Sequence, residues 1–174
     1  MTHTSDFIPS ISASVADWER ERPTSFYDPP RRLLRSIRQF QRLQDKHGPI
    51  AWLRRHLTIA SHHLWSVITA TDIPVNCKIE GGLILAHPTG VVIHPDATLG
   101  VNCWIASCVT IGNGPSGAPK IGGHVDIGTG AKILGGITIG DHAKIGANAV
   151  VITDVPEGST AVGVPAKMLP ADSA

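Results

Sequence analysis

The sequence predicts a mainly β protein, a left-handed parallel β-helix of hexapeptide repeats that follows a short N-terminal helical hairpin. The first indication is a six-residue period between positions 93 and 151, interrupted once at residues 114–120. Each step of six lands on Ile, Leu or Val, at Ile93, Leu99, Ile105, Ile111, Ile121, Ile127, Ile133, Ile139, Ile145 and Val151. In the uninterrupted hexads, the residue two positions earlier is small or β-branched. Six residues fit the alternation of a strand and not a helical face, so each hexad makes a strand and a corner.

The second indication is that the repeat is long enough to stack. Three hexads, about 18 residues, close one triangular coil, and no coil buries its own inner face. The phase extends back to residue 73, with a two-residue slip before Ile93, which makes about four coils. We assign residues 72–168 to the β-helix with its C-terminal extension and residues 169–174 to a tail. The left hand is expected because known proteins with this hexad pattern have it, against the usual crossover rule.

A helical hairpin is predicted over residues 31–71. Its first helix, residues 31–46, places apolar side chains at helical spacing, namely Leu33, Ile37, Phe40 and Leu43. A Gly-Pro pair ends this helix, and a second helix with proline in its first turn follows over residues 49–70. We expect the second helix to bury Trp52, Leu53, Leu57, Ala60, Leu64, Trp65 and Ile68. Residues 1–30 are read as a lead-in that is poorly ordered or draped on a partner.

Composition excludes several function classes. The 174 residues have a formal net charge of +1, contain no apolar run long enough to span a membrane, and begin without a secretion signal. Cys77 and Cys103 fall on the inward small position and are expected to be buried thiols, whereas Cys108 falls on an outward position. No CxxC pair is present, which disfavours zinc binding and redox roles, and we expect a reducing cytoplasm.

The predicted hairpin is strongly basic. Its cations, opposed only by Asp45, are Arg31, Arg32, Arg35, Arg38, Arg42, Lys46, Arg54 and Arg55. This charge fits either a solvated helix face or attraction to an anionic surface, so peripheral contact with membrane headgroups is one expectation. Nucleic acid is disfavoured because no aromatic stacking surface or known nucleic-acid motif accompanies the charge.

From residue 72 onward the sequence resembles the serine O-acetyltransferase family. The resemblance is carried by DIPVNCKIEGGLILAHPTGVVI from Asp72, VTIGNG from Val109, IGTGAKILGGITIG from Ile127, AKIGANAVV from Ala143 and VGVPAK from Val162. The hexads alone are typical of a large superfamily of acyl- and nucleotidyl-transferring enzymes. The spacing Asp-x14-His, with Thr-Gly shortly after the histidine, is more specific. The resemblance covers about residues 68–168 and implies an acetyl-CoA-dependent O-acetyltransferase without a metal. We expect a homotrimer, because a β-helix prism exposes flat faces between which the family builds its acetyl-CoA groove. The hexamer of the family is less expected, because its N-terminal helices are missing here.

The chemistry of acetyl transfer gives a role to two of these residues. A hydroxyl is a poor nucleophile, and a neutral imidazole is suited to accept its proton near neutral pH. A carboxylate behind the imidazole fixes its tautomer and stabilises the cation that forms. His87 follows Asp72 by 15 residues, close to one coil, so the chain returns near Asp72 at this point. The resemblance implies a catalytic dyad, with His87 as the base and Asp72 orienting it.

The resemblance also implies an acetyl-CoA groove between neighbouring subunits. The pantetheine arm would run beside small residues and backbone amides, here Gly112, Thr129, Gly130, Ala131, Gly146 and Ala147. Small residues let a ligand approach the backbone closely, although tight corners need glycine for their own geometry. Lys144 matches a lysine near the nucleotide end, and Lys167 is assigned to phosphate.

Departures from the family pattern leave the acceptor hydroxyl open. Serine-using members carry an Arg-His pair before Pro-Lys in the interrupting loop, where this chain has Gly117-Ala118 before Pro119-Lys120. The family aspartate before the catalytic histidine is Ala86 here. An open, uncharged pocket suits a saccharide hydroxyl of a glycan precursor. L-Serine stays an alternative if Lys120 or an N-terminal arginine supplies the missing cation.

Other function classes are weaker. His124 and His142, 18 residues apart, are expected to stack in one column, as surface imidazoles or as a metal pair. A metal enzyme of the γ-carbonic-anhydrase type needs a His-x4-His pair, which this sequence lacks. A non-catalytic trimeric interaction module is the third class, and an acetyl-CoA assay separates it from an enzyme.

Overall fold

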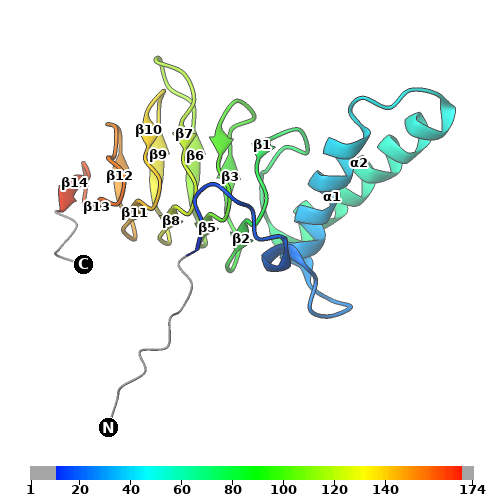
Figure 1. Ribbon diagram of the computed structural model, residues 1–174, viewed down its shortest axis with the longest axis horizontal. Helices are drawn as coiled ribbons and strands as arrows, with labels where there is room; N and C mark the ends of the chain where they lie inside the picture. Colours follow the sequence, from blue (N-terminus) through cyan, green and yellow to red (C-terminus); the bar gives the residue numbers. More distant parts are fainter. Residues whose placement is uncertain (1–10, 170–174) are drawn as a thin grey trace, which may run out of the picture.

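The structure, a computed structural model, describes residues 11–169 as a parallel β-helix with two helices at its N-terminal end (Figure 1). Sheet A contains β3 (Val92–Ile93), β6 (Thr110–Gly112), β9 (Lys132–Leu134) and β12 (Val150–Val151). Sheet B contains β1 (Lys78–Ile79), β4 (Thr98–Leu99), β7 (Lys120–Ile121) and β10 (Thr138–Ile139). Sheet C contains β2 (Ile84–Leu85), β5 (Trp104–Ile105), β8 (Asp126–Ile127), β11 (Lys144–Ile145), β13 (Thr160–Val162) and the antiparallel β14 (Lys167–Leu169). The predicted β-helix of about four coils is confirmed.

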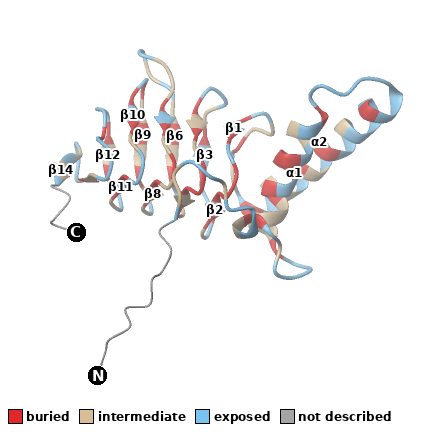
Figure 2. Ribbon diagram, viewed as in Figure 1, coloured by how far each residue is buried: buried red, intermediate tan, exposed pale blue. Residues whose placement is uncertain are grey.

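The inside of the β-helix is filled by the repeated aliphatic positions. The aliphatic residue of every hexad, from Ile93 to Val151, is at most 4% exposed. Parallel pairing stacks like on like, so Leu99 lies beside Ile121 and Ile105 lies beside Ile127. Burying a side chain of this size contributes about 1.5–3 kcal/mol, and each coil supplies the cover for the next. Figure 2 shows the buried positions running along the inside of the coils.

The corner between sheets C and A is stacked as regularly as the strands. Its stacked residues with left-handed backbone are Ala70, Gly90, Cys108, Gly130 and Asn148, and the longer first connection has a further one, His87. From Gly90 onward, the N–H of each donates to a carbonyl oxygen of the coil before, at 2.8 or 2.9 Å. We call this column the C/A corner ladder. It gives the edge of the β-helix a fixed backbone along its whole length.

The hairpin consists of α1 (Pro29–Leu43) and α2 (Pro49–Thr69), which pack against each other. The side chain of Asp28 caps the N-terminus of α1, with prolines in the first turn. Leu33 and Ile37 of α1 are fully buried, as its apolar spacing predicts. Among the described residues, no helix combines the length and the hydrophobicity of a membrane span.

The predicted buried face of α2 is wrong. The buried residues of α2 are Ala51, Thr58, His62 and Thr69. Most of the residues predicted to be buried are exposed instead, namely Trp52, Leu53, Leu57, Ala60, Leu64 and Ile68, whereas Trp65 is half-buried against the core. α2 contacts α1 through smaller side chains. The buried small side chains and the exposed large apolar side chains of α2 both recur with the period of a helix. The period alone therefore does not reveal which of the two faces is covered by α1.

A buried histidine joins α2 to both of its neighbours. The Nε2 atom of His62 lies 2.8 Å from the carbonyl oxygen of Ile73, and its Nδ1 atom lies 2.9 Å from Ser36 Oγ of α1. Burial lowers the pKa of His62, and this effect outweighs the hydrogen bond to Ile73. The ring is therefore neutral at pH 7, and its N–H is on Nε2, because the Ile73 carbonyl can only accept.

We expect acid to loosen the hairpin through His62. A histidine whose pKa is lowered by folding stabilises the fold fully above its unfolded pKa of about 6.5, and this contribution is lost as the pH falls. Urea unfolding midpoints at about pH 7.5, 6.5 and 5.5 should therefore fall more steeply than in His62→Gln. Because the pKa of His124 is also lowered, both proteins are compared in a His124→Gln background. Equal pH slopes with and without His62 would contradict the prediction.

Residues from Ser12 to Glu21 contact the β-helix, so the reading of residues 1–30 as a poorly ordered lead-in is wrong for this part. The predicted lead-in's residues 1–10 and most of the predicted tail, residues 170–174, lie outside the described residues. The packed segment includes the short 3-10 helix η1 (Trp18–Glu21) and crosses the coils in dark blue in Figure 1.

One asparagine holds this segment to the corner between sheets B and C. Asn102 Oδ1 accepts from the N–H of Asp17 at 2.8 Å, and its Nδ2 donates to the carbonyls of Ser12 and Val15 at 2.7 Å each. Arg20 Nη1 donates to the Asn102 carbonyl at 2.7 Å. The contacts are mostly to backbone atoms, so they leave no periodic signal in the sequence.

A buried ion pair then fixes the segment to α1 and to the first coil. Arg38 of α1 donates from Nε and Nη2 to the Glu21 carboxylate at 2.9 and 2.7 Å. The same guanidinium donates to the carbonyls of Ile79 and Glu80, and Glu21 accepts from the N–H of Leu83. The two charged side chains are 9% and 7% exposed.

Candidate active site

His87 stands in an insertion at the C/A corner. Residues 86–91 separate β2 from β3, whereas the next coil needs only residues 106–109 between β5 and β6. His87 falls in this longer connection, has a left-handed backbone with φ of +54°, and is exposed. Histidine tolerates this conformation better than most residues, which allows an imidazole to stand out from the corner.

Asp72 lies on sheet A beside the connection that carries His87. Its N–H donates to the carbonyl of Val91, and its carbonyl accepts from the N–H of Ile93, both at 2.9 Å. The Asp72 side chain is exposed. Within residues 11–169, no hydrogen bond or ion pair joins its carboxylate to His87. The structure places the predicted pair on one side of the first coil without forming the bond between them.

A cavity of about 340 Å³ adjoins His87. One wall is β2 with the residues around it, from Leu83 to His87. The other wall comes from η1 and the start of α1, and its residues are Arg20, Asp28, Pro30, Arg31 and Leu34. Sequence reasoning missed this wall, because it treated the residues before position 31 as a lead-in. Two arginines are among its lining residues, so this cavity differs from the open, uncharged pocket expected for a saccharide and agrees with the alternative of an N-terminal arginine as the cation.

The interrupting loop lies elsewhere in the same chain. Gly117 and Lys120 line a separate hollow of about 430 Å³ with Asn113, Ser116 and Thr138 among its residues. The loop connects sheet A to sheet B, whereas His87 lies between sheets C and A. Within one chain, Lys120 is therefore not the cation beside His87, and Ala86 contributes no charge there.

Part of the predicted acetyl-CoA set lies on the C/A corner ladder. Thr129 and Ala147 are exposed on it, and Gly146 lies just before it. Gly130 has φ of +76°, and a Cβ there would lie 2.1 Å from Asn148 Oδ1, so glycine fits this corner without displacing the Asn148 side chain, whatever it does for a ligand. Ala131 is fully buried, and its N–H and carbonyl are both bonded to the protein, which removes it from any ligand groove.

The remaining predicted acetyl-CoA residues are spread over two sheets. Lys144 on β11 and Lys167 on β14 are exposed on sheet C, toward the C-terminal end of the β-helix. Gly112 ends β6 at the opposite edge of sheet A, where it pairs with Leu134. The ladder and the two lysines therefore share one side of a single chain, and Gly112 does not.

Cys108 is an exposed thiol within the ladder. The other two cysteines are buried as predicted. Burial raises the pKa of Cys77 to about 12, with a contribution from the charge of Asp72, and raises that of Cys103 to about 11. Only Cys108 should react with an alkylating reagent near neutral pH, because the thiolate is the reactive form. The alkylation rate of Cys108 therefore measures how accessible this part of the ladder is to solvent.

The predicted histidine column is present at the corner between sheets B and C. The Nδ1 atoms of His124 and His142 lie 2.8 Å apart. Burial, together with the charges of His142, Arg20 and Lys144, lowers the pKa of His124 against the opposing effect of Asp126. Among the described residues, no group of three or more His, Cys, Asp or Glu side chains is placed to hold a metal ion.

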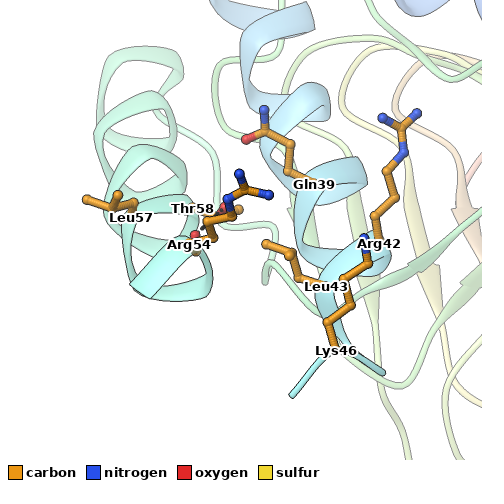
Figure 3. A pocket seen from close by; sticks show the side chains of 7 residues that line it. All are labelled: Gln39, Arg42, Leu43, Lys46, Arg54, Leu57 and Thr58. Atoms are coloured by element: carbon orange, nitrogen blue, oxygen red, sulfur yellow. Dashed lines mark hydrogen bonds between the residues drawn. The ribbon is translucent and has the colours of Figure 1, made fainter. Parts of the chain in front are cut away.

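The basic side chains of the hairpin have unequal roles. Arg38 is buried in its ion pair, and Arg55 donates to three carbonyls at the end of α1. Arg42, Lys46 and Arg54 instead line a hollow of about 460 Å³ between the two helices, together with Gln39, Leu43, Leu57 and Thr58 (Figure 3). This hollow contains no histidine or carboxylate, so it offers no base for acetyl transfer.

Comparison with known proteins agrees with this geometry. The family model described as bacterial transferase hexapeptide (six repeats) matches residues 118–153. The serine acetyltransferase of Escherichia coli strain K12 is 39% identical over 158 residues, which cover 86% of this chain and 56% of the relative. This chain is homologous to the serine acetyltransferases. It spans about half the length of the curated relatives it matches.

Solved serine acetyltransferases share the fold. A serine acetyltransferase in complex with CoA superposes with a TM-score of 0.69 at 36% identity, covering 82% of this chain and 57% of that one. The Neisseria gonorrhoeae serine acetyltransferase in complex with serine gives a TM-score of 0.67 at 39% identity, covering 81% and 57%. The homology extends through the β-helix and into the helices, since these matches cover more than the β-helix alone.

Proposed function

We propose that this chain is an acetyl-CoA-dependent O-acetyltransferase that acetylates the hydroxyl of L-serine. The observation that carries the proposal is the position of His87, exposed in an inserted corner beside a cavity, in a homologue of the serine acetyltransferases. Homologous structures in complex with CoA and with serine support the two substrates. A saccharide hydroxyl is the alternative acceptor.

His87 is the proposed general base. It accepts the hydroxyl proton of the acceptor while the hydroxyl oxygen bonds to the acetyl carbonyl carbon. The C–S bond of the thioester then breaks, and the proton passes to the CoA sulfur, giving free CoA and the O-acetyl product. Asp72 is proposed to orient the imidazole, which requires a rotation of exposed side chains to form the bond absent from this structure.

Acetyl-CoA is proposed to lie along the C/A corner ladder toward sheet C. Small side chains at this edge let a ligand approach the backbone, at Thr129, Gly130, Gly146 and Ala147. The positive charge for the nucleotide phosphates comes from Lys144 and Lys167. The exposed thiol of Cys108 lies on the same edge, so bound acetyl-CoA should shield it.

Assembly and location are also proposals. A homotrimer fits a prism whose flat sheets are exposed, including the apolar Val92 of sheet A at 37% exposure. Peripheral membrane contact stays a prediction, supported by the basic hollow of Arg42, Lys46 and Arg54 and by the exposed apolar stripe of α2. A reducing cytoplasm is proposed from the three free thiols.

The test is release of free CoA thiol from acetyl-CoA by the purified full chain. We expect release to require L-serine, with kcat/KM in the range of about 10⁴ M⁻¹s⁻¹ or more that is ordinary for a true substrate. Light scattering on the same sample should report three times the chain mass of 18.4 kDa. Omission of L-serine and its replacement by monosaccharides are the controls. Thiol release that depends on a sugar and not on L-serine would assign the alternative acceptor, and none with either would contradict the proposal.

A further inference from the structure

The cavity beside His87 contains more positive than negative charge. The charged residues of its lining, apart from the titratable His87, are Arg20, Arg31 and Asp28. Arg20 contacts Arg31 through its backbone carbonyl, and its guanidinium reaches along sheet C to the Asn102 carbonyl. The rest of the lining is apolar or backbone, from Pro30, Leu34 and the residues of β2. In a partly enclosed site of this kind, an unmatched cation favours a ligand with a negative group.

The Asp28 carboxylate is ionised and already accepts hydrogen bonds from other residues of the chain. Burial acts to raise the pKa of Asp28, but hydrogen bonds from Thr24 and Arg31 outweigh it and hold the pKa below its ordinary value. Asp28 Oδ2 accepts from the backbone N–H and the hydroxyl of Thr24 at 3.1 and 3.2 Å. The same oxygen accepts from Arg31 Nη1 at 3.0 Å. One carboxylate therefore balances one of the two guanidinium groups.

The Arg31 side chain is fixed by two hydrogen bonds, which leave further N–H groups of its guanidinium for a ligand. Its Nε donates to the carbonyl of Arg20 at 3.0 Å, while Nη1 donates to Asp28, and its side chain is 32% exposed. Arg20 is fixed in turn by its hydrogen bond to the Asn102 carbonyl. A guanidinium that is already fixed loses little conformational freedom when it binds a ligand, and its planar donors match a carboxylate.

We propose that Arg31, assisted by Arg20, binds the carboxylate of the acetyl acceptor and so selects small hydroxy acids over neutral alcohols and sugars. This inference rests on the proposed acetyltransferase function, with the acceptor hydroxyl at His87. The cation comes from the segment before the β-helix and the first turn of α1, and not from the interrupting loop, which has Gly117 in this chain.

The experiment compares L-serine with 2-aminoethanol, which has the same hydroxyl and amine but no carboxylate. In the unmodified protein, kcat/KM for L-serine should exceed that for 2-aminoethanol by about 10 to 100-fold, as expected for a hydrogen-bonded charge. In Arg31→Gln this ratio should fall toward one, through a higher KM for L-serine. Arg31→Lys should retain part of the preference, because it keeps the charge and loses the planar donors.

The matched control is Arg35→Gln, one helical turn along α1, where the arginine is exposed and outside the cavity. Its preference ratio should equal that of the unmodified protein. The ratio compares two acceptors within one protein, so partial unfolding of a variant does not alter it. A preference that survives in Arg31→Gln, or equal use of both acceptors by the unmodified protein, would overturn the inference and leave the acetyltransferase proposal standing. Transfer to neither acceptor would overturn both.

Discussion

Replacing His87 should reduce acetyl transfer by about 10² to 10⁴-fold, which is the range expected for loss of a general base. The effect should fall on kcat, because the imidazole acts on the proton that leaves the acceptor during bond formation. We would measure His87→Ala and His87→Asn together. Asparagine tolerates the left-handed backbone of this position, so a loss common to both variants belongs to the missing imidazole and not to strain.

Two controls make this test specific. His142→Ala removes a histidine with the same left-handed backbone, φ of +59°, at the other corner of the β-helix, and should leave turnover unchanged. Acetyl-CoA binding is followed separately, as protection of Cys108 from alkylation, and should persist without His87. Asp72→Asn should lower kcat as well, by a smaller factor, because it disturbs only the orientation of the base. Normal turnover in His87→Asn would refute the assignment.

The largest effect on stability should come from the buried pair of Glu21 and Arg38. Removing one partner of a buried pair leaves an uncompensated charge and costs about 3–5 kcal/mol. Arg38→Met additionally strands the carbonyls of Ile79 and Glu80, which the guanidinium satisfies. We therefore expect a large fall in the urea unfolding midpoint, followed by tryptophan fluorescence, since the Trp18 ring stacks on the Arg38 guanidinium.

The double variant separates the pair from its surroundings. The double variant Glu21→Gln, Arg38→Met should lose less stability than the sum of the losses in the two single variants, because it contains no unpaired buried charge. Arg35→Met, an exposed arginine on the same helix, should shift stability by no more than about 0.5 kcal/mol. Strict additivity of the two single effects would show that the charges do not stabilise each other.

The sequence predicts the β-helix well because every coil repeats the same six-residue pattern of inward apolar positions. Inward positions such as Ile105 and Cys103, the outward Cys108 and the column of His124 and His142 all follow from one six-residue phase. A repeat of this length constrains each residue through many equivalent neighbours. The position of His87 at a corner of the first coil follows from the same phase and its two-residue slip.

The hairpin and the wall of the cavity are predicted poorly because they depend on single contacts. The period of α2 is right, but small residues such as Ala51 and Thr58 face α1 where larger ones were expected. The segment from 11 to 28 is held by Asn102 and by one ion pair, and neither has a periodic signature. An N-terminal arginine is a candidate cation from the sequence, but only the folded chain shows that Arg20 and Arg31 line the cavity beside His87.

β14 has a consequence for how molecules meet in solution. A stack of parallel coils has no natural end, and the last strand of each sheet offers unpaired N–H and carbonyl groups to any strand that arrives. In sheet C the chain reverses after β13, and β14 covers that edge antiparallel to it. A second molecule cannot continue the parallel register there, and the hairpin covers the N-terminal end. The regular stacking of coils is therefore interrupted in sheet C, where an antiparallel strand occupies the position that a further coil would need.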